Sequence, residues 1–150
     1  MKKVLFLLVS VTVIFSCSNN SISKDGLESI YDLNTYPQKW QLEKMSGSIP
    51  NSETEGSDME WQETYILNDD GTFIKSRIRN NVVTEATGIF VFQELIDGTY
   101  LILTHQADNE LIGSCSSNPL EEVLWVKSIN RIIGTWNWCD GPGSEYKRIE

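Results

Sequence analysis

The sequence predicts an all-β protein whose strands run antiparallel to their neighbours along the chain. Apolar and aromatic residues flank an Asn-Asp-Asp-Gly turn at residues 68–71, and similar turn chemistry recurs at Asp97 and Gly98. Asp tolerates turn dihedrals and Gly supplies a positive φ, so both sites predict β-hairpins. No segment has a sustained helical period or a fixed repeat. Short, regularly spaced strands separated by turns indicate either a closed barrel or a β-sandwich.

The first half of the chain supplies four of the predicted strands. A loop rich in Ser, Gly, Pro and Glu follows the first of them, over residues 46–58. The fourth strand carries apolar residues on both faces, and Gly88 within it marks a bend of the kind that barrels use at corners. These strands are expected at residues 40–45, 60–67, 72–79 and 82–93.

The second half supplies the remaining five strands. Alternation places Trp125 on the face opposite Leu124, and it places Trp136 and Trp138 together on one face of their strand. Turn residues at 128–130 separate two of these strands. The five strands are expected at residues 100–105, 111–115, 122–127, 131–138 and 145–149.

The composition is that of one acidic domain with a real core. The chain has 150 residues, of which 40% are hydrophobic and 10% aromatic. Its formal net charge is −9, from 12 basic and 21 acidic residues. Phosphate binding needs clustered Lys and Arg, so the charge excludes a nucleic-acid partner. The acidity indicates either simple solubility or a surface complementary to a basic protein or a cationic ligand.

The amino terminus has the pattern of an export signal. Two lysines follow the first residue, residues 4–15 are apolar, and the small residue Ser16 precedes Cys17. An apolar run of this length is too short to cross a bilayer, which needs about 20 residues. We therefore expect residues 1–16 to be a cleaved signal peptide. Cleavage removes two of the 12 basic residues and leaves a formal charge of −11.

Residues 14–17, Ile-Phe-Ser-Cys, resemble the lipobox of bacterial lipoproteins. The resemblance implies that Cys17 carries a thioether-linked diacylglycerol and a third acyl chain such as palmitate, which together anchor the protein durably. The next residue is Ser18 and not the Asp that resembles an inner-membrane retention signal. This favours an outer-membrane anchor with the domain facing the periplasm. Residues 17–38 then form a polar tether, and residues 39–150 form the folded domain.

The two cysteines beyond the lipid site, Cys115 and Cys139, are predicted to form a disulfide. Disulfides persist in the cell envelope, and this one closes a loop of about 24 residues and contributes about 3 kcal/mol. The alternative is two buried thiols. The two cysteines are too far apart in the sequence for a Cys-x-x-Cys motif, which disfavours a redox or zinc role.

The sequence predicts no enzyme, metal site or cofactor. His105 is the single histidine, and it is expected to be a structural residue at a strand end. No nucleophile elbow, paired-histidine motif or phosphate-binding loop is present. The acidic turn at residues 68–71 lacks the ligand spacing of a calcium loop and is better explained as a hairpin turn.

The five tryptophans are the remaining lead to a binding site. Indoles pack in cores, line apolar pockets or stack on sugars. The candidates for a ligand-contacting wall are Trp125, Trp136 and Trp138.

A strand opening with Trp40, the Asp-Gly-Thr-Phe and Asp-Gly-Thr-Tyr hairpins and a final Gly-Thr-Trp strand resemble the lipocalin-like domains of Bacteroidetes lipoproteins. The resemblance covers residues 40–149 and implies an antiparallel up-and-down barrel of about eight strands. It also implies a barrel floor in which Trp40 packs under Arg148 or Lys147.

Two functions follow from these observations. The first is a lipid-anchored, non-catalytic binding protein that holds a small apolar ligand. The alternative is an acidic interaction or inhibitor module, similar to anchored lysozyme inhibitors, with a filled barrel that meets a basic protein partner.

Overall fold

The structure is a computed structural model, which describes residues 32–150. The predicted signal peptide, the lipidated Cys17 and most of the tether lie outside these residues. The described chain forms strands and two short 3₁₀ helices, η2 (Gly56–Asp58) and η3 (Trp136–Cys139). The strands are β1 (Gln38–Ser46), β2 (Thr54–Glu55), β3 (Gln62–Leu67), β4 (Thr72–Arg79), β5 (Val82–Leu95), β6 (Gly98–His105), β7 (Glu121–Ser128), β8 (Arg131–Gly134) and β9 (Gly143–Arg148).

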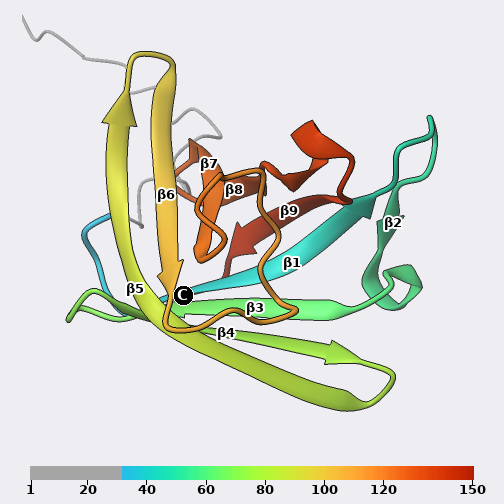
Figure 1. Ribbon diagram of the computed structural model, residues 1–150, viewed down its shortest axis with the longest axis horizontal. Helices are drawn as coiled ribbons and strands as arrows, with labels where there is room; N and C mark the ends of the chain where they lie inside the picture. The colour runs from blue at the N-terminus through green and yellow to red at the C-terminus, as the bar shows by residue number, and fades with distance from the viewer. Residues whose placement is uncertain (1–31) are drawn as a thin grey trace, which may run out of the picture.

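The strands form a closed antiparallel barrel of eight strands, as the sequence predicts (Figure 1). From β3 to β9 each strand pairs with its neighbour in sequence, and β1 pairs with both β3 and β9 to close the barrel. The two-residue β2 lies outside this circle and pairs with the end of β1. Among the described residues, no helix is long and apolar enough to cross a membrane.

Turn residues join the hairpins in the way that the sequence predicts. Gly71 has a φ of +80°, and Asn80 and Asn81, with φ of 52° and 64°, form the two-residue turn between β4 and β5. At the preceding hairpin, the carboxylate of Asp70 accepts hydrogen bonds from the backbone N–H and the hydroxyl of Thr72. Local side-chain bonds of this kind fix the turn, and with it the register of β3 against β4.

The core lies inside the barrel and is built from alternate residues of each strand. On β3 the buried positions are Tyr65 and Leu67, together with the more polar Glu63 between Trp61 and Tyr65. The core cluster comprises Trp40, Leu42, Met45, Met59, Trp61, Tyr65, Leu67, Phe73, Leu101, Leu103, Leu124, Ile132 and Tyr146. Each of these residues is at most 7% exposed, so they pack together away from solvent.

Gly88 lies where β5 passes from one neighbour to the other. A Cβ atom at this position would lie 2.1 Å from the carbonyl oxygen of Thr104 and 2.6 Å from the ring of Phe73. β5 is 14 residues long and curves strongly along its length (Figure 1). The close backbone approach therefore requires glycine at this point of the barrel wall.

Two of the predicted strands differ from the structure. Residues 111–115 are not a strand, because their backbone groups bond to side chains of the barrel and not to a neighbouring strand. The strand expected at residues 131–138 ends at Gly134, and residues 136–139 turn into η3, which Asp140 ends with a φ of 72°. Trp136 and Trp138 consequently do not share the face of a strand.

The residues just before β1 pack against one end of the barrel. Arg148 donates hydrogen bonds to the carbonyl oxygens of Asp32 and Thr35, at 2.8 and 2.9 Å. The side-chain amide of Gln38 donates to the carbonyl of Leu33 at 2.6 Å. The end of the segment that the sequence assigns to the tether is thus in contact with the folded domain.

Candidate functional site

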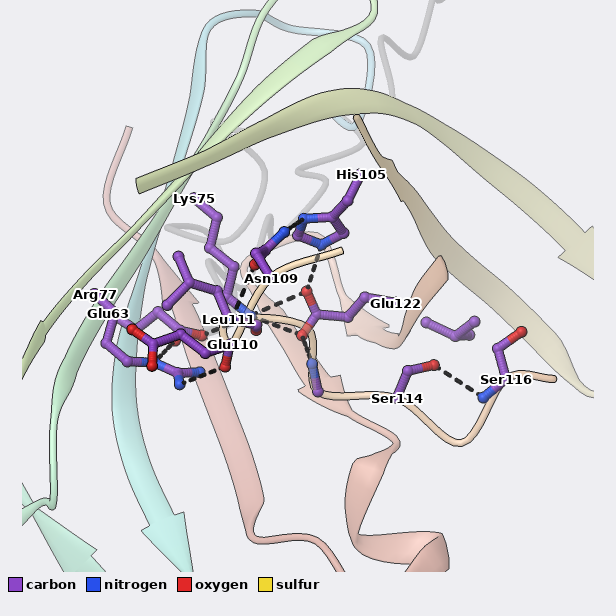
Figure 2. A network of polar contacts seen from close by, with 12 residues as sticks. Glu63, Lys75, Arg77, His105, Asn109, Glu110, Leu111, Ser114, Ser116 and Glu122 are labelled. Carbon is purple, nitrogen blue, oxygen red and sulfur yellow. Dashed lines mark hydrogen bonds and ion pairs between the residues drawn. The ribbon is translucent and has the colours of Figure 1, made fainter. Parts of the chain in front are cut away.

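The most unusual feature of the barrel interior is a cluster of charged side chains, which we call the interior charge cluster (Figure 2). Its members are Glu63 on β3, Lys75 and Arg77 on β4, His105 on β6 and Glu122 on β7. All five side chains are buried. Charged side chains are seldom buried unless they are paired, so this cluster defines the centre of the candidate site.

Lys75 is the hub of the interior charge cluster. Its ammonium donates hydrogen bonds to both carboxylate oxygens of Glu122, at 2.8 and 3.0 Å, and to the carbonyl oxygen of Leu111 at 2.5 Å. It also lies 3.2 Å from a carboxylate oxygen of Glu63 and 4.9 Å from the ring centroid of Tyr65. The side chain is 1% exposed. Its charge is therefore neutralised by neighbours and not by solvent.

Glu63 connects the lysine to the other half of the cluster. Its Oε2 accepts a hydrogen bond of 2.5 Å from Nε of Arg77, and its Oε1 accepts one of 2.6 Å from the hydroxyl of Tyr146. Arg77 also lies 4.3 Å from the ring of Trp61 and donates to the carbonyl oxygen of Glu110 at 3.4 Å. Every charged group at this end of the cluster is thus held by at least two partners.

His105 completes the cluster on the side of β6. Its Nε2 lies 3.3 Å from a carboxylate oxygen of Glu122, and its Nδ1 lies 3.3 Å from the side-chain amide nitrogen of Asn109. An amide nitrogen donates, so Nδ1 accepts and the neutral ring carries its proton on Nε2, toward the carboxylate. The ring also meets that of Phe73 edge to face, at a centroid distance of 5.0 Å.

The loop between β6 and β7 holds the cluster from one side (Figure 2). The carbonyl groups of Glu110 and Leu111 accept from Arg77 and Lys75, and the backbone N–H of Gly113 donates to Glu122 at 3.3 Å. The loop therefore supplies backbone dipoles that complement both signs of charge. This contribution replaces the strand that the sequence predicts over residues 111–115.

Burial and charge shift the ionisation of three groups in this region. Burial by itself raises the pKa of Glu122, but Lys75 and His105 overcome this effect and hold the pKa below its ordinary value. Burial raises the pKa of the Tyr65 and Tyr146 phenols well above 10, and the nearby carboxylates act in the same direction. The cluster accordingly favours an ionised Glu122 beside neutral phenols.

The arrangement links strands β3, β4, β6 and β7 across the interior of the barrel. The carboxylates of Glu63 and Glu122 face the basic side chains of Lys75 and Arg77, so the cluster contains two acidic and two basic groups besides the histidine. Both carboxylates are occupied by several donors each. Among residues 32–150, no group of three or more His, Cys, Asp or Glu side chains is placed to hold a metal ion.

The predicted disulfide between Cys115 and Cys139 is present. It joins the loop between β6 and β7 to η3. The two cysteines lie 24 residues apart in the sequence. The disulfide therefore fixes the same loop whose carbonyl groups contact Lys75 and Arg77.

Trp40 and Arg148, predicted to form the barrel floor, are cross-strand neighbours on β1 and β9. The guanidinium carbon lies 6.0 Å from the ring centroid of the indole. Trp40 is fully buried, and its Nε1 donates to the side-chain oxygen of Gln38 at 3.1 Å. This pair lies where the residues before β1 reach the barrel, as the contacts of Arg148 with Asp32 show.

The three tryptophans proposed as a ligand wall have three different surroundings. Trp125 lies on the outer face of β7, with the ammonium of Lys127 4.5 Å from its ring, while Leu124 points into the core. Trp136 packs so closely on Gly113 that a Cβ there would lie 2.7 Å from the ring. Trp138 is 65% exposed. The structure thus does not gather the three indoles around the interior.

Trp136 instead lines a groove of about 300 Å³ beside the interior charge cluster. The same groove contains Trp61, whose ring lies 4.3 and 5.6 Å from the guanidinium carbons of Arg77 and Arg79. Arg79 is in turn paired with Glu60. This groove therefore contains cations whose charges are already balanced by neighbouring carboxylates.

Four members of the interior charge cluster, Glu63, Lys75, Arg77 and Glu122, are not among the site residues predicted from the sequence. The alternation of side chains along a strand could have identified them. Lys75 lies two residues after the buried Phe73 and so lies on the same face of β4. Charged residues in phase with buried aromatic residues indicate interior charges. Their pairing across the barrel depends on strand order, which no local pattern contains.

Comparison with known proteins adds no relative. No family model, curated protein or solved structure matches the chain.

Proposed function

We propose that this chain is a lipid-anchored, non-catalytic binding protein of the cell envelope, with a lipocalin-like barrel that acts through its surface on a basic protein partner. This is the alternative of the two functions that the sequence predicts. The first, a barrel that holds a small apolar ligand, is less well supported by the interior of this barrel.

The observation that carries the proposal is the occupied interior. An eight-stranded barrel has room for side chains or for one small ligand. Here the interior contains Lys75, Glu63 and Glu122, each almost fully buried, with Lys75 paired to both carboxylates. An apolar ligand placed against these groups would separate them from their partners, and an unpaired buried charge costs several kcal/mol. The available binding surface is therefore the outside of the barrel.

The charge of the chain supports a basic partner. The formal net charge is −9 before any processing. Two of the 12 basic residues, Lys75 and Arg77, are buried in the interior of the barrel. The equally buried Glu63 and Glu122 balance these two cations, so the net negative charge of the chain resides on residues outside the interior charge cluster. Acidic surfaces attract basic proteins and speed their association at low salt.

The membrane anchor is proposed from the lipobox resemblance at residues 14–17. Acylated Cys17 would hold the barrel at the outer membrane, and the following residues would give it reach into the periplasm. Replacing Cys17 with Ala is expected to move the protein from the membrane to the soluble fraction of the cell envelope. Recovery of the Cys17→Ala protein in the membrane fraction would contradict the anchor.

The test of the proposed function has two measurements on the full chain purified in mild detergent. Native mass spectrometry is expected to give the mass of the protein without a co-purifying apolar molecule. Binding to a strongly basic protein, with lysozyme as the probe, is expected at 50 mM salt and should weaken by at least about tenfold at 500 mM salt. An apolar adduct together with no binding to the basic probe would overturn the proposal in favour of the ligand-holding barrel.

A further inference from the structure

One strand of the barrel has an open edge. β5 pairs with β4 over Val82 to Ile89 and with β6 over Gly88 to Leu95. From Phe90 onward, β5 therefore has a strand partner on one side only, among the residues that the structure describes. Figure 1 shows the hairpin of β5 and β6 extending beyond the neighbouring strands.

The backbone groups on this open edge can be assigned from the ladder on either side of β5. In an antiparallel pair, successive residues direct their N–H and C=O groups to opposite sides. The carbonyl of Thr87 accepts from Gln106 on the β6 side, and the N–H of Phe90 donates to Gly71 on the β4 side at 2.9 Å. The backbone groups of Phe92 and Glu94 consequently point to the side that has no strand.

A groove of about 310 Å³ runs beside this edge. Its aromatic part is formed by Tyr36, Phe90 and Phe92, with ring centroids 5.8 Å apart for Tyr36 and Phe90 and 6.0 Å apart for the two phenylalanines. Its lining residues are Asn34, Tyr36, Asn68, Asp69, Gly71, Phe90, Val91 and Phe92. The groove thus combines apolar side chains with an unpaired strand edge.

The charge around the groove is negative. Asp69 is exposed and lines the groove, and Glu94 is exposed at the end of the open edge. No Lys or Arg is among the residues that line it. A ligand with positive charge is therefore favoured over one with negative charge.

We propose that this open edge of β5 binds an extended, basic segment of a partner protein by strand addition. The segment would pair with the backbone groups of Phe92 and Glu94, place an apolar side chain against Tyr36 and Phe92, and direct Lys or Arg toward Asp69. The inference rests on the proposed function and names its site. Natural proteins usually protect an exposed edge, so an edge beside an aromatic groove indicates a place for a partner strand.

A second copy of this chain fits the edge less well. Pairing of two β5 edges would bring Asp69 and Glu94 of both copies to the same interface, and like charges across an interface disfavour association. A basic segment removes this repulsion and adds a salt-dependent attraction. The charge therefore selects the partner peptide over self-association.

The test uses the full chain in mild detergent and a blocked eight-residue peptide of alternating lysine and valine as the probe. Phe92→Pro removes both the aromatic ring and the edge N–H. The matched control Phe92→Leu removes the ring and retains the N–H. We expect Phe92→Pro to bind the probe at least about tenfold more weakly than Phe92→Leu by isothermal titration calorimetry. Equal affinity of the two variants, or no binding of the probe to the unmodified chain at 1 mM, would overturn the assignment.

A second measurement leaves the protein unchanged and so does not depend on the folding of the Phe92→Pro variant. Two versions of the probe carry N-methyl groups on the amides of the lysines or of the valines, which blocks one edge of the peptide strand in each case. We expect one version to bind as the parent peptide does and the other to lose at least about tenfold in affinity. Equal binding of both versions would show that the peptide does not add as a strand.

Two further outcomes distinguish a wrong site from a wrong function, and a partner peptide from a second copy of the chain. If the Phe92→Pro chain folds and still binds lysozyme with the affinity of the unmodified chain, the proposed function stands and the site at β5 is wrong. If sedimentation velocity shows a dimer that Phe92→Pro abolishes, the edge belongs to a second copy, and the peptide assignment is wrong.

Discussion

Lys75 on β4 and Glu122 on β7 form an ion pair across the interior of the barrel, with the ammonium 2.8 and 3.0 Å from the two carboxylate oxygens. The strands that carry them are separated in the sheet by β5 and β6. The pair depends on the curvature of the sheet from β4 to β7, so it reports on tertiary structure and not on a local hairpin. It also connects the barrel wall to the disulfide-linked loop through the carbonyl group of Leu111.

Removal of the lysine is expected to destabilise the protein strongly. Lys75→Met leaves Glu122 buried without its lysine partner, and it leaves Glu63 with Arg77 as its remaining cation. Loss of one member of a buried pair typically costs about 3–5 kcal/mol. Urea denaturation should show a reduction of this size in the free energy of unfolding. A reduction below about 1 kcal/mol would contradict the role of Lys75 as the hub of the interior charge cluster.

A double variant is the matched control for this prediction. Lys75→Met with Glu122→Leu removes both charges and replaces them with apolar side chains. Because replacement of a whole buried pair is often neutral, the double variant is expected to regain part of the stability that Lys75→Met loses. Additive losses in the double variant would show that the two residues do not interact.

Acid is expected to weaken the protein through Glu122. Burial raises the pKa of Glu122, but Lys75 and His105 lower it by more than burial raises it, so the pKa lies below the ordinary 4.5. A carboxyl group with a lowered pKa in the folded state stabilises the protein above the pKa of the unfolded chain, and this contribution disappears as the pH falls through the folded-state value. The unfolding free energy of the unmodified protein should therefore exceed that of Glu122→Gln by a constant amount above about pH 5 and by less below pH 4.5. A difference that stays constant down to pH 2.5 would argue against a lowered pKa.

Loss of the disulfide is expected to loosen the loop between β6 and β7. Cys115→Ala with Cys139→Ala opens a link between residues 24 apart, which corresponds to about 3 kcal/mol of unfolding free energy. The loop should also become a site of limited proteolysis, because it then remains held mainly by the hydrogen bonds to Lys75, Arg77 and Glu122. The unmodified protein treated with reductant is the matching control and should behave like the double variant.

Gly88 is expected to tolerate no side chain. Gly88→Ala would place its Cβ 2.1 Å from the carbonyl oxygen of Thr104, so β5 or β6 must shift, at a cost of about 3 kcal/mol. At Gly47, where the nearest atom to a Cβ is Oγ of Ser52 at 3.4 Å, the same substitution should change the stability by less than about 0.5 kcal/mol. Thermal unfolding of the two variants compares them directly, and equal melting temperatures would contradict the close packing at Gly88.

The sequence alone determines the local elements of this fold. The turns at residues 68–71 and at Asp97-Gly98 predict the β3–β4 and β5–β6 hairpins of the structure, because turn dihedrals depend on the residues in the turn itself. The disulfide between Cys115 and Cys139 also follows from the sequence, since only two cysteines remain beyond the predicted lipid site. These features depend on composition and short-range chemistry.

Only the tertiary structure determines the interior and the open edge. The charges at Glu63, Lys75 and Glu122 lie far apart in the chain, and their pairing requires the closed order of the strands. Residues 111–115 form a loop whose backbone groups bond to Lys75 and Glu122, and Lys75 comes from a strand that lies far from the loop in the sequence. The open edge beyond Phe90 arises because β5 is longer than β4, a difference in length between neighbours that has meaning only once they lie side by side.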